Sequence, residues 1–144
     1  MPEVSVIIPV YNNEKFVERC IRSVMEQSSE DLEILVINDG STDGSGDILE
    51  ELAAQDSRIR YMKQENKGVA EARNRGIDHA RGVYLTFVDG DDYIGRDYIR
   101  NFYDAAREKQ AEMLICGLSY VDMDGRLLRR TVPGEYRKLD KEEW

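Results

Sequence analysis

Three aspartates within four residues, Asp89, Asp91 and Asp92, follow the apolar run at residues 84–88. Carboxylates this close together repel one another, and a shared divalent cation relieves the repulsion. The apolar run predicts a buried strand, and open α/β sheets bind their ligands at the carboxyl ends of such strands. Hard oxygen ligands suit Mg²⁺ or Mn²⁺, and Mg²⁺ commonly takes only one or two carboxylates together with substrate phosphates. A solvated acidic turn is the alternative interpretation, because Asp and Gly are ordinary turn residues.

The hydrophobic pattern predicts that strands and helices alternate along the chain. Unbroken apolar runs predict strands at 4–9, 32–37, 59–62 and 83–88, and apolar stripes predict helices at 14–27, 45–55, 68–81 and 97–110. This alternation favours an α/β fold, in which helices cover both faces of a mostly parallel sheet. A fifth strand at 113–122 and the Asp124-Gly125 dipeptide before residues 126–132 predict a type I′ hairpin. The sheet is therefore expected to end in an antiparallel element.

The composition argues against several classes of protein. At 144 residues the chain fits one domain, and its net charge of −9 argues against nucleic acid or an anionic membrane surface as the main partner. Cys20 in a helical pattern and Cys116 in a strand pattern are interpreted as small buried residues, so a reducing, cytoplasmic setting is the default. No apolar segment is long enough to span a bilayer, and no secretory signal is visible. Any peripheral attachment to a membrane would reside in a further C-terminal part.

The last residues carry a signal for the start of a helix. Asp140 and Glu143 resemble a capping box, yet the chain ends at Trp144, before a helix could form. We therefore expect residues 1–144 to be a single domain that is cut short at its C-terminus. A natural, frayed tail is the alternative interpretation.

Three polar clusters follow predicted strands, namely Tyr11-Asn12-Asn13, Asp39 and the aspartates at 89–92. Right-handed crossovers place the carboxyl ends of parallel strands along one edge, and a strand order of 3-2-1-4 would bring these clusters into one crevice. Tyr11 then offers a flat face for stacking on a base, and Asp39 can accept a hydrogen bond from a ribose hydroxyl or a base N–H. The alternatives are a lid on the core for Tyr11 and an ordinary turn for Asp39.

The turn at residues 9–14 contains no glycine, which excludes the glycine-rich turn that cradles a dinucleotide pyrophosphate. The chain contains no P-loop either. A mononucleotide that is held without these loops needs another counter-charge for its diphosphate. A cation on Asp91 can supply one, and Arg73 on the third predicted helix can supply a second. The spacing fits Arg73 as a plain surface charge equally well.

The motifs, taken in order, resemble those of the family 2 glycosyltransferases with the GT-A fold. V-S-V-I-I-P-V-Y-N at residues 4–12 is similar to the opening of that family, and V-I-N-D-G-S-T-D at 36–43 to its second nucleotide-binding motif. N-K-G at 66–68, A-R-N-R-G at 72–76 and F-V-D-G-D-D at 87–92 resemble its third segment and its D-x-D motif. The resemblance runs over residues 4–93 with the family's order and spacing.

This resemblance implies a GT-A fold and a site for a nucleoside-diphosphate sugar donor, with a UDP-sugar favoured. The residues implied to hold the donor nucleotide are Pro9, Tyr11, Asn12, Glu14, Asp39, Asn66, Arg73 and Asp89. Asp91, together with Asp89, is implied to bind the Mn²⁺ or Mg²⁺ that bridges the diphosphate. Glu14 and Asp92 are weaker matches and are interpreted as supporting residues.

The resemblance also implies transfer of the sugar, with inversion at the anomeric carbon, to a hydroxyl of a carbohydrate or lipid-linked acceptor. In this family a carboxylate well after the D-x-D motif normally activates that hydroxyl. Asp122, Asp124 and Glu135 follow the motif here, but their context predicts a hairpin. The base is therefore expected beyond Trp144, unless one of these three residues serves in an unusual way.

Three other functions remain compatible with parts of the pattern. A nucleotidyltransferase that makes nucleotide sugars would need a glycine-rich basic loop after its first strand, which residues 9–14 lack. A Mg²⁺-binding receiver domain has a similar length, but it leaves the Tyr11-Asn12 turn unexplained. The third is a chain that binds a nucleotide sugar without turning it over, because its acceptor half is absent.

Overall fold

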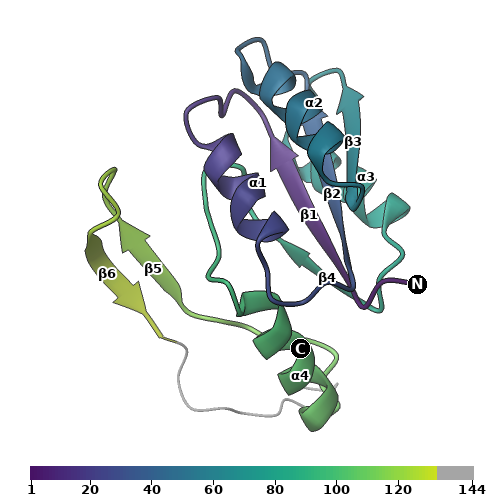
Figure 1. The fold of residues 1–144 in the computed structure, drawn as a ribbon, viewed down its shortest axis with the longest axis vertical. Coiled ribbons are helices and arrows are strands. Elements are labelled where there is room, and N and C mark those ends of the chain that lie inside the picture. Colours follow the sequence, from purple (N-terminus) through teal and green to yellow (C-terminus); the bar gives the residue numbers. More distant parts are fainter. Residues whose placement is uncertain (133–144) are drawn as a thin grey trace.

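A four-stranded parallel sheet forms the centre of the computed structural model, which describes residues 1–132 (Figure 1). Its strands are β1 (Val4–Val10), β2 (Leu32–Asp39), β3 (Ile59–Gln64) and β4 (Tyr84–Phe87), in the order β3-β2-β1-β4. The helices are α1 (Val17–Met25), α2 (Ser45–Gln55), α3 (Val69–His79) and α4 (Tyr98–Lys109). Helices α1 and α2 cover one face of the sheet and α3 covers the other. The α/β fold and the predicted strand order are confirmed.

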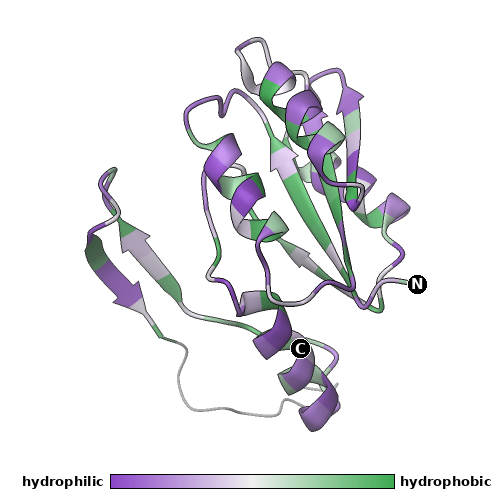
Figure 2. Cartoon of the chain, viewed as in Figure 1, coloured by the Kyte–Doolittle hydropathy of each residue, from purple (hydrophilic) through white to green (hydrophobic). Residues whose placement is uncertain are grey.

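Two apolar cores bury β1 and β2, and Figure 2 shows the hydrophobic residues concentrated on these strands. Successive side chains of a strand point to opposite faces, so Val6 and Ile8 belong to the core with α1 and α2, whereas Ile7 belongs to the core with α3. Complete burial of one such side chain contributes about 2 kcal/mol. Helix α3 packs closely because Gly76 lacks a side chain, and a Cβ there would collide with Cγ2 of Ile7.

Two helices are shorter than the periodicity predicts. The helix expected at 14–27 runs over Val17–Met25, because residues 14–16 form a turn and the N–H groups of Asn12 and Glu14 donate to side chains of the β2–α2 loop. The helix expected at 68–81 ends at His79, because the N–H groups of Arg81 and Gly82 donate to Ser5 Oγ in β1. In both cases contacts that are distant in sequence override the local pattern.

Strands β5 (Leu118–Val121) and β6 (Leu127–Thr131) form the antiparallel element expected near the C-terminus. They make a separate two-stranded sheet, which stands apart from the main sheet in Figure 1. The predicted type I′ turn is wrong, because Gly125 has a φ of +80° but Asp124 has no positive φ. Asp122 Oδ1 accepts the N–H groups of Asp124 and Arg126, which selects a different turn, and the register shifts after Tyr120 as in a β-bulge.

The fifth strand is also shorter than predicted. Residues 113–117, which include Cys116, are irregular, so the strand pattern assigned to that cysteine is wrong. Both cysteines are free, and Cys20 is completely buried in α1, as expected. Glu135, and the capping box of Asp140 and Glu143, lie outside the described residues.

A buried polar network closes the edge of the sheet at which β1 and β2 begin. Ser5 Oγ donates to Glu33 Oε1 over 2.7 Å, and Arg60 Nη1 donates to Glu33 Oε2 over 2.9 Å. The N–H of Arg81 also donates to Glu33 Oε1, over 2.6 Å. Burial alone raises the pKa of Glu33, but the hydrogen bonds from Ser5, Arg81 and Arg60 outweigh it, so that this pKa lies below its ordinary value of 4.5.

Glu33→Gln is expected to lower the free energy of unfolding by about 2 kcal/mol near neutral pH, because it removes a charged acceptor of several hydrogen bonds. A carboxyl group whose pKa is depressed on folding stabilises the chain above its unfolded pKa, and this contribution is lost as the pH falls through the folded pKa. The difference between wild type and variant should therefore shrink below about pH 4.5. Urea unfolding at about pH 7 and about pH 3.5 measures it, and a difference that is independent of pH would contradict this role of the charge.

Candidate functional site

The candidate site lies at the opposite edge of the sheet, where all four parallel strands have their carboxyl ends. The β1–α1 loop carries Tyr11, β2 ends at Asp39, and the chain after β4 carries the aspartates of the D-x-D motif. Strands β1 and β4 are neighbours, and the chain continues from β1 to β2 on the side away from β4. The topological switch point of the sheet therefore lies between β1 and β4 at this edge. Tyr11 leaves 48% of its surface exposed, whereas Pro9 is buried within β1.

Asp39 organises the β3–α3 loop. Its residue surface is 2% exposed, and its carboxylate accepts hydrogen bonds from Gln64 Nε2 (2.7 Å) and from the N–H groups of Lys67 (2.9 Å) and Gly68 (2.8 Å). A carboxylate has about four acceptor positions, so about one is left for a ligand. The same loop places the backbone of Asn66 against Gly40, the residue that follows Asp39.

Arg73 on α3 and Asp89 after β4 form an ion pair. Arg73 Nη2 donates to Asp89 Oδ1 over 2.6 Å, and the guanidinium carbon lies 5.8 Å from the centre of the Phe87 ring. Within residues 1–132 the Nε atom of Arg73 is buried and has no hydrogen-bond partner. Arg73 is therefore a half-buried cation at the strand edge, rather than a plain surface charge on α3.

The D-x-D turn is bonded to Cys20 of α1. The carbonyl of Asp89 accepts the N–H of Asp92 over 2.9 Å and the thiol of Cys20 over 3.4 Å. Gly90 fits against the end of β1, because a Cβ there would lie 3.2 Å from the carbonyl oxygen of Pro9. Burial, followed by the charges of Asp92, Asp91 and Asp89, raises the pKa of the Cys20 thiol to about 12, so it stays protonated and can donate.

The acidic cluster carries negative charge that the described residues only partly balance. Partial burial and then the charges of Asp91 and Asp89 raise the pKa of Asp92. Asp89 is paired with Arg73, whereas the Asp91 carboxylate makes no hydrogen bond or ion pair within the described part of the chain. Among residues 1–132, no group of three or more ligating side chains converges to hold a metal by itself. The donor set therefore fits a divalent cation that takes one or two carboxylates and completes its shell with phosphate oxygens and water.

Asn12 and Glu14, both predicted to hold the nucleotide, bond to the neighbouring β2–α2 loop. Asn12 Oδ1 accepts the N–H of Thr42 (2.8 Å), and Glu14 Oε2 accepts the N–H of Gly44 (2.8 Å). Their partners in that loop, and Gln64 beside Asp39, are functional residues that the motifs do not predict. One signal was available, because Ser and Asp just before a helix commonly bond to backbone N–H groups.

Two of the three candidate bases, Asp122 and Asp124, are not brought to the site. Asp122 and Asp124 lie in the turn of the hairpin, where Asp122 Oδ1 bonds to two backbone N–H groups. Figure 1 shows this hairpin well away from the carboxyl ends of the main strands. Their predicted hairpin context is confirmed.

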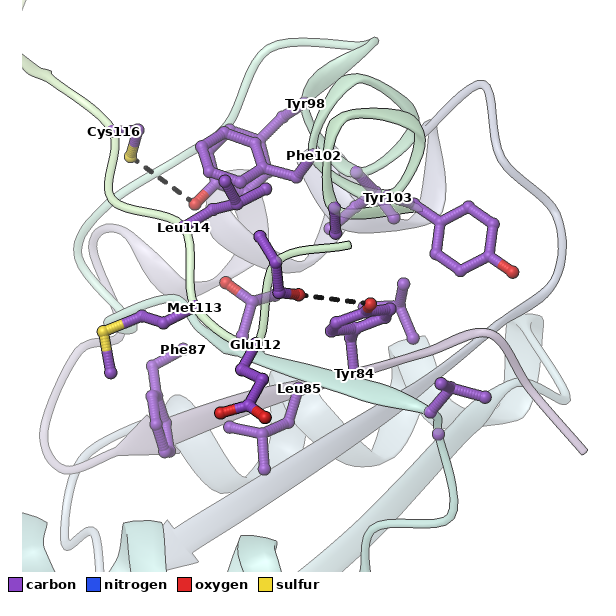
Figure 3. A pocket seen from close by; sticks show the side chains of 17 residues that line it. Tyr84, Leu85, Phe87, Tyr98, Phe102, Tyr103, Glu112, Met113, Leu114 and Cys116 are labelled. Atoms are coloured by element: carbon purple, nitrogen blue, oxygen red, sulfur yellow. Dashed lines mark hydrogen bonds between the residues drawn. The ribbon is translucent and has the colours of Figure 1, made fainter. Parts of the chain in front are cut away.

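An apolar cavity of about 540 Å³ lies beside β4 (Figure 3), and the aspartates at 89–92 are not among the described residues that line it. Tyr98, Phe102 and Tyr103 of α4 line this cavity, and Tyr103 meets Tyr84 edge-on, with ring centres 6.1 Å apart. The remaining space between these rings, β4 and residues 111–116 is open. Nothing in the hydrophobic pattern predicts this cavity.

Comparison with known proteins identifies the family to which this fold and site belong. The sequence model of glycosyl transferase family 2 matches residues 5–143. The chain belongs to this family. An uncharacterized glycosyltransferase of Bacillus subtilis (strain 168), EpsJ, is 44% identical over 126 residues, which are 88% of this chain and 37% of EpsJ.

Solved structures confirm the GT-A fold for this member of glycosyl transferase family 2. S. aureus TarS 1-349, crystallised in complex with UDP, has a TM-score of 0.70 and 29% identity over 76% of this chain and 33% of that one. The mannosyltransferase PcManGT from Pyrobaculum calidifontis, in complex with GDP-Man and Mn²⁺, has a TM-score of 0.67 and 28% identity over 83% and 35% of the respective chains. The chain thus spans about a third of the length of these relatives. No helix within residues 1–132 has the length and hydrophobicity needed to cross a membrane.

Proposed function

We propose that this chain supplies the donor site of a metal-dependent, inverting glycosyltransferase, which transfers a sugar from a nucleoside diphosphate to an acceptor hydroxyl. The observation that carries the proposal is the placement of the Arg73–Asp89 pair, the unpaired Asp91 and the exposed Tyr11 at one edge of the sheet. The complexes of its relatives with UDP and with GDP-Man support a nucleoside-diphosphate sugar as the donor. We favour a UDP-sugar.

Each side chain has a distinct task in this proposal. Tyr11 stacks on the base, and the remaining acceptor position of Asp39 takes a base N–H or a ribose hydroxyl. Arg73 balances charge on the diphosphate, and Asp89 contacts the ribose or the sugar. Asn66 lies in the loop that Asp39 orders, against the backbone of Gly40.

The metal of the proposal is Mn²⁺ or Mg²⁺, held by Asp91 with help from Asp89. When bound, it would neutralise charge on the departing diphosphate. The PcManGT complex with Mn²⁺ supports this assignment by relationship, and the unbalanced charge of the acidic cluster supports it by chemistry.

The acceptor and the base lie outside what the described residues supply. A carbohydrate or lipid-linked hydroxyl is proposed as the acceptor, and a carboxylate beyond residue 132 is proposed as the base. The two free cysteines favour a reducing, cytoplasmic compartment as the place of the reaction. Because turnover needs that base, the present chain is proposed to bind the donor in any case, and to transfer sugar only with it.

A thermal-shift titration tests the donor site. UDP, GDP, ADP and inorganic phosphate are added to the chain with and without Mn²⁺, because a ligand that binds only the folded state raises the unfolding midpoint. A rise with UDP that requires Mn²⁺ is the expected result. A rise with GDP alone would identify the donor as a GDP-sugar rather than a UDP-sugar. A rise with phosphate alone would favour the receiver-like alternative. No rise with any nucleotide on a folded chain would overturn the proposal.

A further inference from the structure

The β1–α1 loop and the β2–α2 loop are joined by reciprocal hydrogen bonds. The N–H of Asn12 donates to Ser41 Oγ over 3.1 Å, and Asn12 Oδ1 in turn accepts the N–H of Thr42 over 2.8 Å. Asn12 has a φ of +52°, a left-handed conformation that few residues other than glycine adopt readily. Its backbone and its side chain are therefore both fixed by the neighbouring loop.

Glu14 makes the same kind of exchange two residues later. Its N–H donates to Asp43 Oδ2 over 3.1 Å, and its Oε2 accepts the N–H of Gly44 over 2.8 Å. Asp43 Oδ1 also accepts the N–H of Ser45, the first residue of α2. Burial alone would raise the pKa of Asp43, but the hydrogen bonds from Ser45 and Glu14 outweigh burial, so this pKa lies below its ordinary value. The carboxylate is therefore a stable acceptor at neutral pH.

The hydrogen bonds of Asn12 and Glu14 with residues 41–44 form a clamp between the two loops. A buried asparagine ties this clamp to the sheet. Asn38, at the end of β2, is completely buried, and its Oδ1 accepts the N–H of Ser41 over 2.9 Å. Its Nδ2 donates to the hydroxyl of Tyr61 in β3 over 3.0 Å. A chain of hydrogen bonds thus runs from β3 through Asn38 and Ser41 to Asn12.

These contacts give Asn12 a task that differs from the predicted one, and they give the supporting role of Glu14 a definite form. We propose that they are positioning residues, which lock the loop of Tyr11 to the loop that follows Asp39, so that stacking face and carboxylate hold one nucleotide together. Asn12 Oδ1 and Glu14 Oε2 each already accept a backbone N–H of the other loop. The inference rests on the proposed function, because it concerns the site for the donor nucleotide.

The test compares Glu14→Ala, Glu14→Gln, Asn12→Ala and Asp43→Ala, with Glu50→Ala on the exposed face of α2 as a charge-matched control for Glu14→Ala. Two quantities are measured for each, the Kd of UDP in the presence of Mn²⁺ and the hydrogen exchange of the Glu14, Thr42 and Gly44 amides without nucleotide. Glutamine keeps a side-chain oxygen that can accept the N–H of Gly44, whereas alanine does not. Asp43 is the partner of Glu14 from the other loop, and it is not among the residues proposed to contact the nucleotide.

We expect each of the three alanine substitutions in the clamp to weaken UDP binding about tenfold, which corresponds to about 1.4 kcal/mol, and to speed exchange at the amide that has lost its acceptor or its loop partner. Glu14→Gln should restore both quantities, and Glu50→Ala should change neither. The double variant of Glu14→Ala and Asp43→Ala should lose little more than either single variant, because both break one clamp.

Two results would overturn the inference and leave the proposed function standing. The first is that Glu14→Gln loses as much affinity as Glu14→Ala while the Gly44 amide stays protected, which would place Glu14 on the ligand. The second is wild-type affinity in the alanine variants. Failure of the proposed function looks different, because wild type itself would then bind no UDP, and both proposals would fall together.

Discussion

Asp91→Asn is expected to abolish the part of nucleotide affinity that depends on Mn²⁺. We expect UDP binding in the presence of Mn²⁺ to weaken by about two orders of magnitude, or about 2.7 kcal/mol, while the weaker binding without metal stays unchanged. The reason is that asparagine keeps the shape of the side chain but removes the charge that a hard cation needs. Calorimetric titration of UDP with and without Mn²⁺, on wild type and variant, measures both quantities.

The two carboxylates of the D-x-D motif are unequal before any ligand binds, and this decides the choice of Asp91. Asp89 is already paired with Arg73 over 2.6 Å, so a cation that used it would compete with a guanidinium. Asp91 is exposed, and within residues 1–132 nothing bonds to its carboxylate. Asp91 is therefore the carboxylate that a cation can reach at the lower cost.

Asp78→Asn is the matched control, because it removes the same charge from an exposed position near the end of α3. Its UDP affinity should equal that of wild type at every Mn²⁺ concentration. Equal losses in Asp78→Asn and Asp91→Asn would show that net charge, and not ligation, governs binding. Retention of the full Mn²⁺ effect in Asp91→Asn would contradict the metal assignment.

The parallel sheet could be predicted because burial determines it. Residues 4–10 and 32–39 are apolar almost without interruption, and every residue of both strands is buried between helices. Right-handed crossovers then leave few possible orders, and β3-β2-β1-β4 is the order observed. The convergence of Tyr11, Asp39 and the aspartates followed from the order alone, without knowledge of any side-chain contact.

The partners of the polar loop residues could not be predicted, because they depend on contacts between distant segments. A polar side chain after a strand can serve a ligand or another loop, and the sequence is the same in both cases. Asn12 and Glu14 bond to residues about 30 positions away, at Thr42 and Gly44. The hairpin turn failed for a related reason, since the side chain of Asp122 selected its backbone conformation.

Gly40→Ala is expected to cost about 3 kcal/mol of unfolding free energy and to weaken UDP binding as well. Gly40 has a φ of +73°, where a side chain is strained by about 1–2 kcal/mol. A Cβ there would also lie 2.7 Å from the backbone nitrogen of Asn66, closer than real Cβ atoms come. The β3–α3 loop would have to move away, and Asp39 would lose hydrogen bonds from Lys67 and Gly68, each worth about 1.5 kcal/mol or more.

Two further substitutions separate strain from collision, and urea unfolding of all three measures the difference. Gly125 also has a positive φ, of 80°, but a Cβ there would meet nothing within 4 Å, so Gly125→Ala should cost only about 1 kcal/mol. Gly40→Asn places a residue that tolerates the left-handed conformation at the crowded position, as Asn12 does in this chain. If the collision with Asn66 accounts for most of the lost unfolding free energy, asparagine will be no better than alanine at position 40. If asparagine instead restores stability and UDP binding, the backbone conformation alone requires the glycine, and the contact between the Asp39 and Asn66 loops is not what shapes the site.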